Sequence, residues 1–234
     1  MSDVADQIAG QVSGVAEAML PETPFVARGL RLDWAAKRGL DIGVASTALF
    51  LLLPLMLVIA ALVWAGDRKA PIFRHTRLGR HGRSSGCLKF RSRVPDGEGV
   101  PAPHLAARPR ARAGWAATHK LSHDPRITAI GQVLRKTSLD ELPQLWNVLR
   151  GEMSLVGPRP IVQAEVARYG RAFATCFAVP PGVTGLWQVS GRADTTYAER
   201  VALDVDYASR WHLRRDIPIR RRTVPAVLAQ RGGK

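Results

Sequence analysis

The feature that most constrains this chain is a strongly apolar run from Ile42 to Gly66, with no charged residue between Asp41 and Asp67. A helix of that length spans roughly 36 Å at about 1.5 Å per residue, enough to cross a hydrocarbon core of about 30 Å. Length alone therefore favours a single transmembrane helix. The protein would then be a single-pass structural partner with its two ends on opposite sides of a membrane.

The residues around and within the run favour a different topology. Basic residues stand on both sides of it, the nearest being Arg38 before and Arg68 after, and such residues favour the cytoplasmic side of a membrane. Pro54, near the midpoint, removes one helical hydrogen bond and clashes with the preceding turn. We therefore predict a re-entrant membrane hairpin over 37–66, made of helix, break at Pro54 and helix, which enters one leaflet and returns. Everything after it would stay on the cytoplasmic face.

Charge divides the rest of the chain. Residues 1–36 hold five acids and two bases, a net charge of −3, so the remainder carries +18 and the whole chain +15. This charge favours polyanionic partners, namely nucleic acid, anionic lipid or a phosphorylated substrate. We predict an acidic N-terminal tail over 1–36, disordered or weakly helical, the hairpin over 37–66, a catalytic domain over 67–207 and a basic membrane-surface segment over 208–234.

Periodicity predicts an α-rich α+β fold for the catalytic domain. Expected strands lie at 71–73 and 87–91, and expected helices at 106–117, 139–150, 161–169 and 197–211. Pro218 is expected to interrupt any helix in the basic C-terminal segment. Only two cysteines are present, which excludes a disulfide framework and a four-cysteine zinc site.

A helix with two carboxylates at its start is the most informative local pattern. It begins either at Ser138, with Glu141 completing a capping box, or as late as Asp140. Helical spacing sorts its side chains into two faces. We expect Leu142, Leu145, Trp146 and Leu149 to face the core, and Asp140, Gln144 and Asn147 to form the opposite stripe.

Such a carboxylate pair is commonly a capping and dipole device worth about 0.3–1 kcal/mol per group. Here the neighbourhood is cationic, with Arg126, Arg135 and Arg159 close in sequence. Cations lower carboxylate pKa values, so we expect Asp140 to be ionised and to act as a nucleophile. A phosphorylated substrate beside two carboxylates calls for Mg²⁺, with Glu141 as its candidate ligand. The alternative is a membrane-tethered basic binding module without catalysis.

The motifs together resemble the bacterial sugar transferase family, the monotopic polyprenyl-phosphate phosphoglycosyl transferases that initiate exopolysaccharide and O-antigen synthesis. The resemblance covers about Lys37 to Leu228. It rests on Lys37-Arg38 with Asp41, His75-x-Arg77-x-Gly79, Lys89-Phe90-Arg91-Ser92, Asp124-Pro125-Arg126, Arg135 to Gln144, Gly151 to Pro160 and the loop around Trp187.

This resemblance implies a Mg²⁺-dependent transfer of sugar 1-phosphate, of galactose or glucose type, from a UDP-sugar to undecaprenyl phosphate, with release of UMP. Asp140 would form an aspartyl-phosphosugar intermediate and Glu141 would hold the metal. The partners would be UDP-sugar, undecaprenyl phosphate and anionic lipid of the bacterial inner membrane rather than nucleic acid. Substrate contacts would come from Lys89, Arg91, Asp124, Arg126, Arg135, Arg159, Gln188 and Arg192, and lipid-headgroup contacts from Lys37, Arg38 and Asp41.

Overall fold

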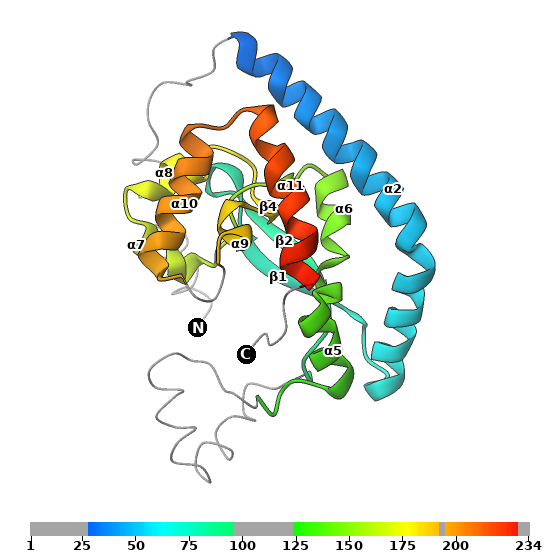
Figure 1. Cartoon of the computed structure of the whole chain (residues 1–234). Helices are drawn as coiled ribbons and strands as arrows, with labels where there is room; N and C mark the ends of the chain where they lie inside the picture. Colours follow the sequence, from blue (N-terminus) through cyan, green and yellow to red (C-terminus); the bar gives the residue numbers. More distant parts are fainter. Residues whose placement is uncertain (1–27, 96–123, 192–194, 229–234) are drawn as a thin grey trace.

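The apolar run forms part of a single long helix. In the computed structural model, which describes residues 28–95, 124–191 and 195–228, helix α2 extends from Arg28 to Asp67 and contains Pro54 in its interior. The predicted break at Pro54 is therefore wrong, because the loss of one hydrogen bond curves the helix along the side of the domain without ending it (Figure 1). By length and composition, its stretch from Leu32 to Asp67 could cross a membrane, and 18 consecutive residues within it reach a mean hydropathy of 2.7.

Two short β-ladders lie within the domain. Strands β1 (Ile72–Leu78) and β2 (Ser84–Phe90) form an antiparallel hairpin in which Ile72 faces Phe90 and Leu78 faces Ser84. The strands expected near 71–73 and 87–91 thus exist and are longer than predicted. Strands β3 (Ser154–Val156) and β4 (Gly182–Thr184) pair in parallel. They were not predicted, because three residues are too few to display an alternating pattern.

Helices make up most of the rest, so the helix-rich α+β prediction is confirmed. The expected helix over 139–150 is split into a 3-10 turn and α6, and the one over 161–169 is split into a 3-10 turn and α7. The expected helix over 197–211 is observed as α10. The expected helix over 106–117 lies outside the described residues. The helices are α5 (Ala129–Thr137), α6 (Gln144–Leu149), α7 (Val166–Tyr169), α8 (Ala172–Cys176), α9 (Leu186–Val189), α10 (Tyr197–Ser209) and α11 (Leu213–Leu228), with 3-10 turns at Arg80–Gly82, Leu139–Glu141 and Gln163–Glu165. Helix α11 continues through Pro218, so the expected interruption there is wrong.

Helix α2 contributes buried residues to two hydrophobic clusters of the domain, and its Trp34 packs against a third. Ala45 is fully buried in a cluster with Leu145 and Val148, and Ile59 and Val63 are buried in another beside Phe90 and Leu134. Most side chains between these two contacts are exposed, Phe50 to 78%, whereas Leu49 and Met56 are partly buried against the clusters. Helix α2 therefore packs on the domain at Ala45 and again near its C-terminal end, while its exposed face is apolar. Figure 1 shows the helix along one side of the molecule.

Candidate active site

The carboxylate pair lies on a 3-10 turn, Leu139–Glu141, between α5 and α6. Ser138 adopts a left-handed conformation with φ 57°, and its backbone N–H donates to the Arg135 carbonyl, which ends α5. The Ser138 side chain makes no capping bond to this turn, and α6 begins at Gln144 after Pro143. Neither predicted helix start is observed, because the sharp turn at Ser138 separates α5 from the carboxylates.

Asp140 is a buried carboxylate, only 9% exposed. Its burial raises its pKa to about 6, while the charge of Lys89 acts in the opposite direction. The expectation of a lowered pKa is wrong, because loss of hydration outweighs the attraction of the nearby cations. At pH 7 a group with this pKa is about 90% ionised, so Asp140 still exists mainly as a carboxylate.

Glu141 lies at the edge of a small cleft, which we call the catalytic cleft. Its Oε1 accepts a hydrogen bond from Lys89 Nζ at 2.6 Å, an ion pair in which both side chains are partly exposed. The described residues that line the catalytic cleft are Arg77, Cys87, Lys89, Glu141, Gln144, Arg159, Pro160, Gly182 and Val183. Three cations and one carboxylate thus converge on one cleft of about 10 Å³, and this set of charges, rather than the space, suits a phosphate group.

Helix α6 is held against the hairpin by a buried amide. Asn147 is 1% exposed; its Oδ1 accepts from Leu88 N at 2.9 Å and its Nδ2 donates to Gly86 O at 2.8 Å. The expected faces of this helix are therefore partly wrong. Gln144 and Asn147 are buried whereas Trp146 is 51% exposed, because the polar stripe packs on β2, where it meets backbone partners.

An ordered group of charged and aromatic side chains adjoins the cleft. Arg77 lies 3.7 Å from Glu165, and Arg200 NH1 donates to the other oxygen of Glu165 at 3.2 Å. Arg159 and Arg200 both lie over the Trp187 ring, with centroid distances of 5.9 and 4.8 Å. The sequence places Arg77 in the His-x-Arg-x-Gly motif, but Arg77 was not among the predicted substrate-binding residues.

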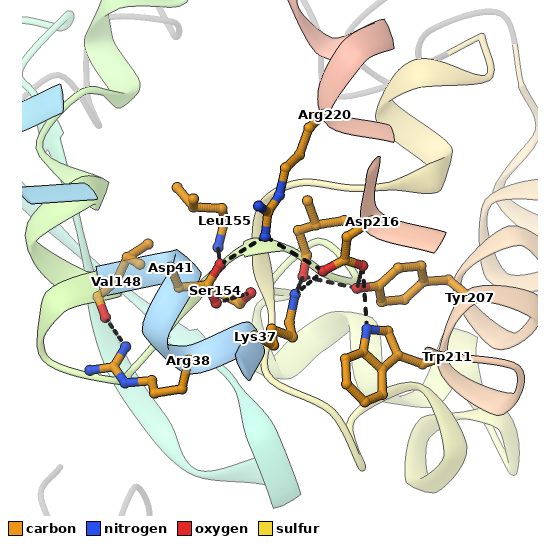
Figure 2. A network of polar contacts seen from close by, with 11 residues as sticks. Lys37, Arg38, Asp41, Val148, Ser154, Leu155, Tyr207, Trp211, Asp216 and Arg220 are labelled. Atoms are coloured by element: carbon orange, nitrogen blue, oxygen red, sulfur yellow. Dashed lines mark hydrogen bonds and ion pairs between the residues drawn. The ribbon is translucent and has the colours of Figure 1, made fainter. Parts of the chain in front are cut away.

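The basic and acidic residues before the apolar run are engaged inside the protein (Figure 2). Lys37 is 2% exposed, pairs with Asp216 of α11 and donates to Val156 O at 3.0 Å. Asp41 is equally buried and accepts from Ser154 Oγ at 2.6 Å. A lipid-headgroup role for Lys37 and Asp41 is not supported, because these contacts join α2 to β3 and α11.

Arg38 and Arg220 extend the same network. Arg38 donates to the carbonyls of Val148 and Leu149 at the C-terminal end of α6, at 2.5 and 2.8 Å. Carbonyls at a helix end lack partners within the helix, so a cation is favourable there. Arg220 of α11 reaches Asp41 Oδ1 at 3.4 Å (Figure 2). The start of α2 is thereby fastened to α6, β3 and α11 together.

The other predicted substrate-binding residues lie in different surroundings. Arg91 pairs with Asp67 and donates to Ala70 O at 2.8 Å, so it fastens the end of α2 to β2. Asp124 and Arg126 form an ion pair at 2.7 Å, and the hydrogen bond from Arg126 lowers the pKa of Asp124. Arg135 is exposed on α5, Gln188 is buried on α9, and Arg192 falls outside the described residues.

The carboxylates fit a hard divalent cation. Mg²⁺ takes oxygen ligands and is commonly held by one or two carboxylates together with substrate phosphates. Glu141 supplies such an oxygen donor at the rim of the catalytic cleft. Among the described residues no cluster of three or more His, Cys, Asp or Glu side chains occurs, so a metal here would depend on the substrate for further ligands.

The fold and this site define a helix-rich enzyme with a long apolar helix and a cationic cleft beside a carboxylate pair. Residues 32–230 match the model of the bacterial sugar transferase family, and the chain belongs to this family. It is therefore a sugar transferase, which sets aside the alternative of a binding module without catalysis.

Three relatives illustrate the similarity. The chain is 49% identical over 197 residues to the exopolysaccharide production protein ExoY of Rhizobium meliloti, covering 84% of this chain and 87% of the relative. It is 50% identical over 196 residues to the UDP-galactose-lipid carrier transferase of Erwinia amylovora, covering 84% of this chain but 41% of the relative. It is 39% identical over 213 residues to a UDP-glucose:undecaprenyl-phosphate glucose-1-phosphate transferase of Caulobacter vibrioides, covering 88% and 72%.

Proposed function

We propose that the protein transfers galactose 1-phosphate or glucose 1-phosphate from a UDP-sugar to undecaprenyl phosphate, releasing UMP, as the first membrane step of exopolysaccharide synthesis. The activities for which two of its relatives are named support this donor and acceptor. The observation that carries the proposal is the buried Asp140 next to Glu141, at a cleft lined by Lys89, Arg77 and Arg159. Cations there would bind a diphosphate, and a carboxylate would react with it.

The proposed chemistry consists of two displacements at one phosphorus. An Asp140 oxygen forms a bond to the sugar-bearing phosphorus while the bond from that phosphorus to the oxygen of the leaving UMP breaks. A phosphate oxygen of undecaprenyl phosphate then attacks the same phosphorus, and the bond to Asp140 breaks. The products are UMP and undecaprenyl diphosphate sugar, and the carboxylate of Asp140 is restored. Burial of Asp140 limits the access of water to the intermediate, which protects it from hydrolysis.

The other cleft residues would bind and orient the donor. Arg77 and Arg159 would each provide a guanidinium fork for non-bridging phosphate oxygens. Lys89, which holds Glu141 at 2.6 Å, would neutralise negative charge beside the carboxylates. We propose that Glu141 holds Mg²⁺, which when bound neutralises the charge of the diphosphate.

We further infer that the protein is monotopic and lies on the cytoplasmic face of the inner membrane, with α2 entering one leaflet and returning to the same side. Packing supports this topology. Ala45 near the start of the apolar run and Val63 near its end are both buried against the same domain. A helix that crossed the bilayer would carry one of these contacts to the far side, away from the domain. The outer face of the curved helix would contact lipid.

Cysteine labelling tests this topology. Leu20→Cys and Val100→Cys lie on either side of the apolar run, and both native cysteines are buried, which keeps background labelling low. We expect both engineered positions to react with an impermeant thiol reagent from the same side of inverted membrane vesicles. Reaction from opposite sides would overturn the one-leaflet topology.

Trapping tests the chemistry. Enzyme incubated with UDP-sugar labelled in the sugar-bearing phosphate, without acceptor, should carry covalent label that Asp140→Asn lacks. Glu141→Gln is the matched variant at the adjacent carboxylate. We expect it to bind to membranes normally and to lose most of its Mg²⁺-dependent UMP release. Label on Asp140→Asn equal to that on the wild type would reject the assigned nucleophile.

A further inference from the structure

A second and larger cleft runs along strand β1; we call it the β1 cleft. Its volume is about 520 Å³, and its described lining is Arg74, His75, Thr76, Arg77, Leu78, Ser84, Val162, Gln163 and Ala164. This size lies within the range of ligand pockets, about 300–1,000 Å³. Arg77 lines both the β1 cleft and the catalytic cleft. A ligand whose phosphate binds Arg77 can therefore reach into the β1 cleft with its remaining part.

The Arg77 side chain is held in place from three directions. Its NH1 lies 3.7 Å from Glu165 Oε2 and 3.5 Å from Pro160 O, and its NH2 lies 3.3 Å from His75 Nδ1. Glu165 is in turn fixed by Arg200 at 3.2 Å. The guanidinium that separates the two clefts is thus oriented before any ligand arrives, which reduces the ordering cost of binding.

This contact determines the tautomer of His75. A guanidinium can only donate, so Nδ1 of His75 accepts from Arg77 and the ring hydrogen of the neutral imidazole lies on Nε2. Burial lowers the pKa of His75, and the charges of Arg77, Lys89, Arg159 and Arg93 lower it further. The ring is therefore neutral at pH 7. Within the described part of the chain, no hydrogen bond involves Nε2, which leaves one N–H donor for a ligand.

We propose that the β1 cleft binds the sugar of the donor, and that His75 is a specificity-determining residue whose Nε2–H donates to a sugar hydroxyl. This inference rests on the proposed function. The lining favours a sugar over the nucleoside, because its polar side chains, including those of Thr76, Ser84 and Gln163, can hydrogen-bond hydroxyl groups. Apart from the His75 imidazole, the described lining offers no aromatic ring for a base to stack on.

Two substitutions at position 75 separate the role of the Nε2–H donor from that of Nδ1, which accepts from Arg77. His75→Asn retains an oxygen near the position of Nδ1, so it can still accept from Arg77, but it has no donor at the distal position. His75→Gln can place an amide N–H near the position of Nε2. Ser209→Ala on α10, whose hydroxyl bonds only to Val205 O among the described residues, serves as the control for handling and folding.

The measurements are KM and kcat for UDP-galactose and UDP-glucose, and the inhibition constant of UMP, with enzyme in lipid nanodiscs. For His75→Asn we expect KM for the preferred donor to rise about tenfold, the effect of one lost hydrogen bond, with little change in kcat. We expect the UMP inhibition constant of His75→Asn to stay within twofold of the wild type. His75→Gln should recover most of the donor affinity. The ratio of kcat/KM between the two donors should change only in His75→Asn.

The outcomes distinguish a wrong assignment of the sugar site from a wrong proposed function. A parallel rise in the UMP inhibition constant would place the nucleotide in the β1 cleft and overturn the assignment to the sugar. Wild-type KM in His75→Asn would remove His75 from substrate binding altogether. Equal loss in His75→Asn and His75→Gln would also overturn the proposed donor role of Nε2. If the proposed function itself were wrong, the wild-type enzyme would release no UMP from either donor.

Discussion

Replacing Asp140 by Asn should inactivate the enzyme and stabilise it. The folded protein raises the pKa of this carboxyl from 3.8 to about 6 by burial, a cost of about 3 kcal/mol for the ionised form at ~1.36 kcal/mol per pKa unit. Asn has nearly the same shape and no charge, but its amide is also buried. We therefore expect a gain of about 1–3 kcal/mol at pH 7.5, or roughly 3–10 °C in Tm for a domain of this size.

The sign of this effect depends on pH. Because the folded-state pKa lies above the unfolded value, the folded protein binds more protons between pH 3.8 and about 6. The wild type therefore carries the full cost above pH 6 and loses it as the pH falls toward 3.8. The advantage of Asp140→Asn should be largest at pH 7–8 and should fall toward zero near pH 4.

The assay is thermal unfolding of wild type and variant in the same detergent, at matched scan rates, from pH 4 to pH 8, together with UMP release at pH 7.5. Glu141→Gln is the control, because Glu141 is partly exposed and ion-paired with Lys89, so its removal should give no comparable stabilisation. The reasoning is refuted if Asp140→Asn unfolds at a lower temperature than the wild type at pH 7.5, or if its stabilisation does not change with pH.

Three further predictions follow from the described contacts. UMP release should rise with pH between 5 and 7 with an apparent pKa near 6, because Asp140 must be ionised to react; a flat profile over that range contradicts this. Lys37→Met should cost about 3–5 kcal/mol of unfolding free energy, because the buried Asp216 loses its nearest cation and keeps Arg220 at 3.8 Å, and adding Asp216→Leu should recover part of it; a single variant as stable as wild type contradicts this. Asn147→Ala should cost about 2–4 kcal/mol in denaturant unfolding through two lost buried hydrogen bonds to β2, whereas the exposed Trp146→Ala should change little; equal effects contradict this.

Local patterns in the sequence predicted the elements but not their environments. The hairpin strands and helix α10 could be predicted, because alternation and helical spacing are short-range properties. The β3–β4 pair could not, because two strands of three residues gain their stability from contacts between distant segments. Helix α2 is continuous through Pro54 because the domain packs against it on both sides of that residue.

For the candidate site, too, the residues could be predicted from the sequence but their surroundings could not. The Asp-Glu pair, Lys89 and Arg159 could be selected from the sequence, and Lys89, Glu141 and Arg159 do line one cleft. The pKa of Asp140 could not be predicted, because its neighbours in sequence are cations whereas its surroundings in space exclude water. Likewise, Lys37 and Asp41 resemble charges at a membrane border, and only the position of α11 reveals that they are buried.

The burial of Ala45, Ile59 and Val63 makes one face of helix α2 part of the hydrophobic core of the domain. Deleting α2 to obtain a water-soluble catalytic fragment would open two hydrophobic clusters at once, so we expect such a fragment to aggregate. During biosynthesis the domain can complete its core only after this helix has docked. With α2 in the membrane, as proposed above, maturation of the enzyme would be coupled to arrival at the bilayer, and molecules that miss the membrane should be inactive and prone to degradation.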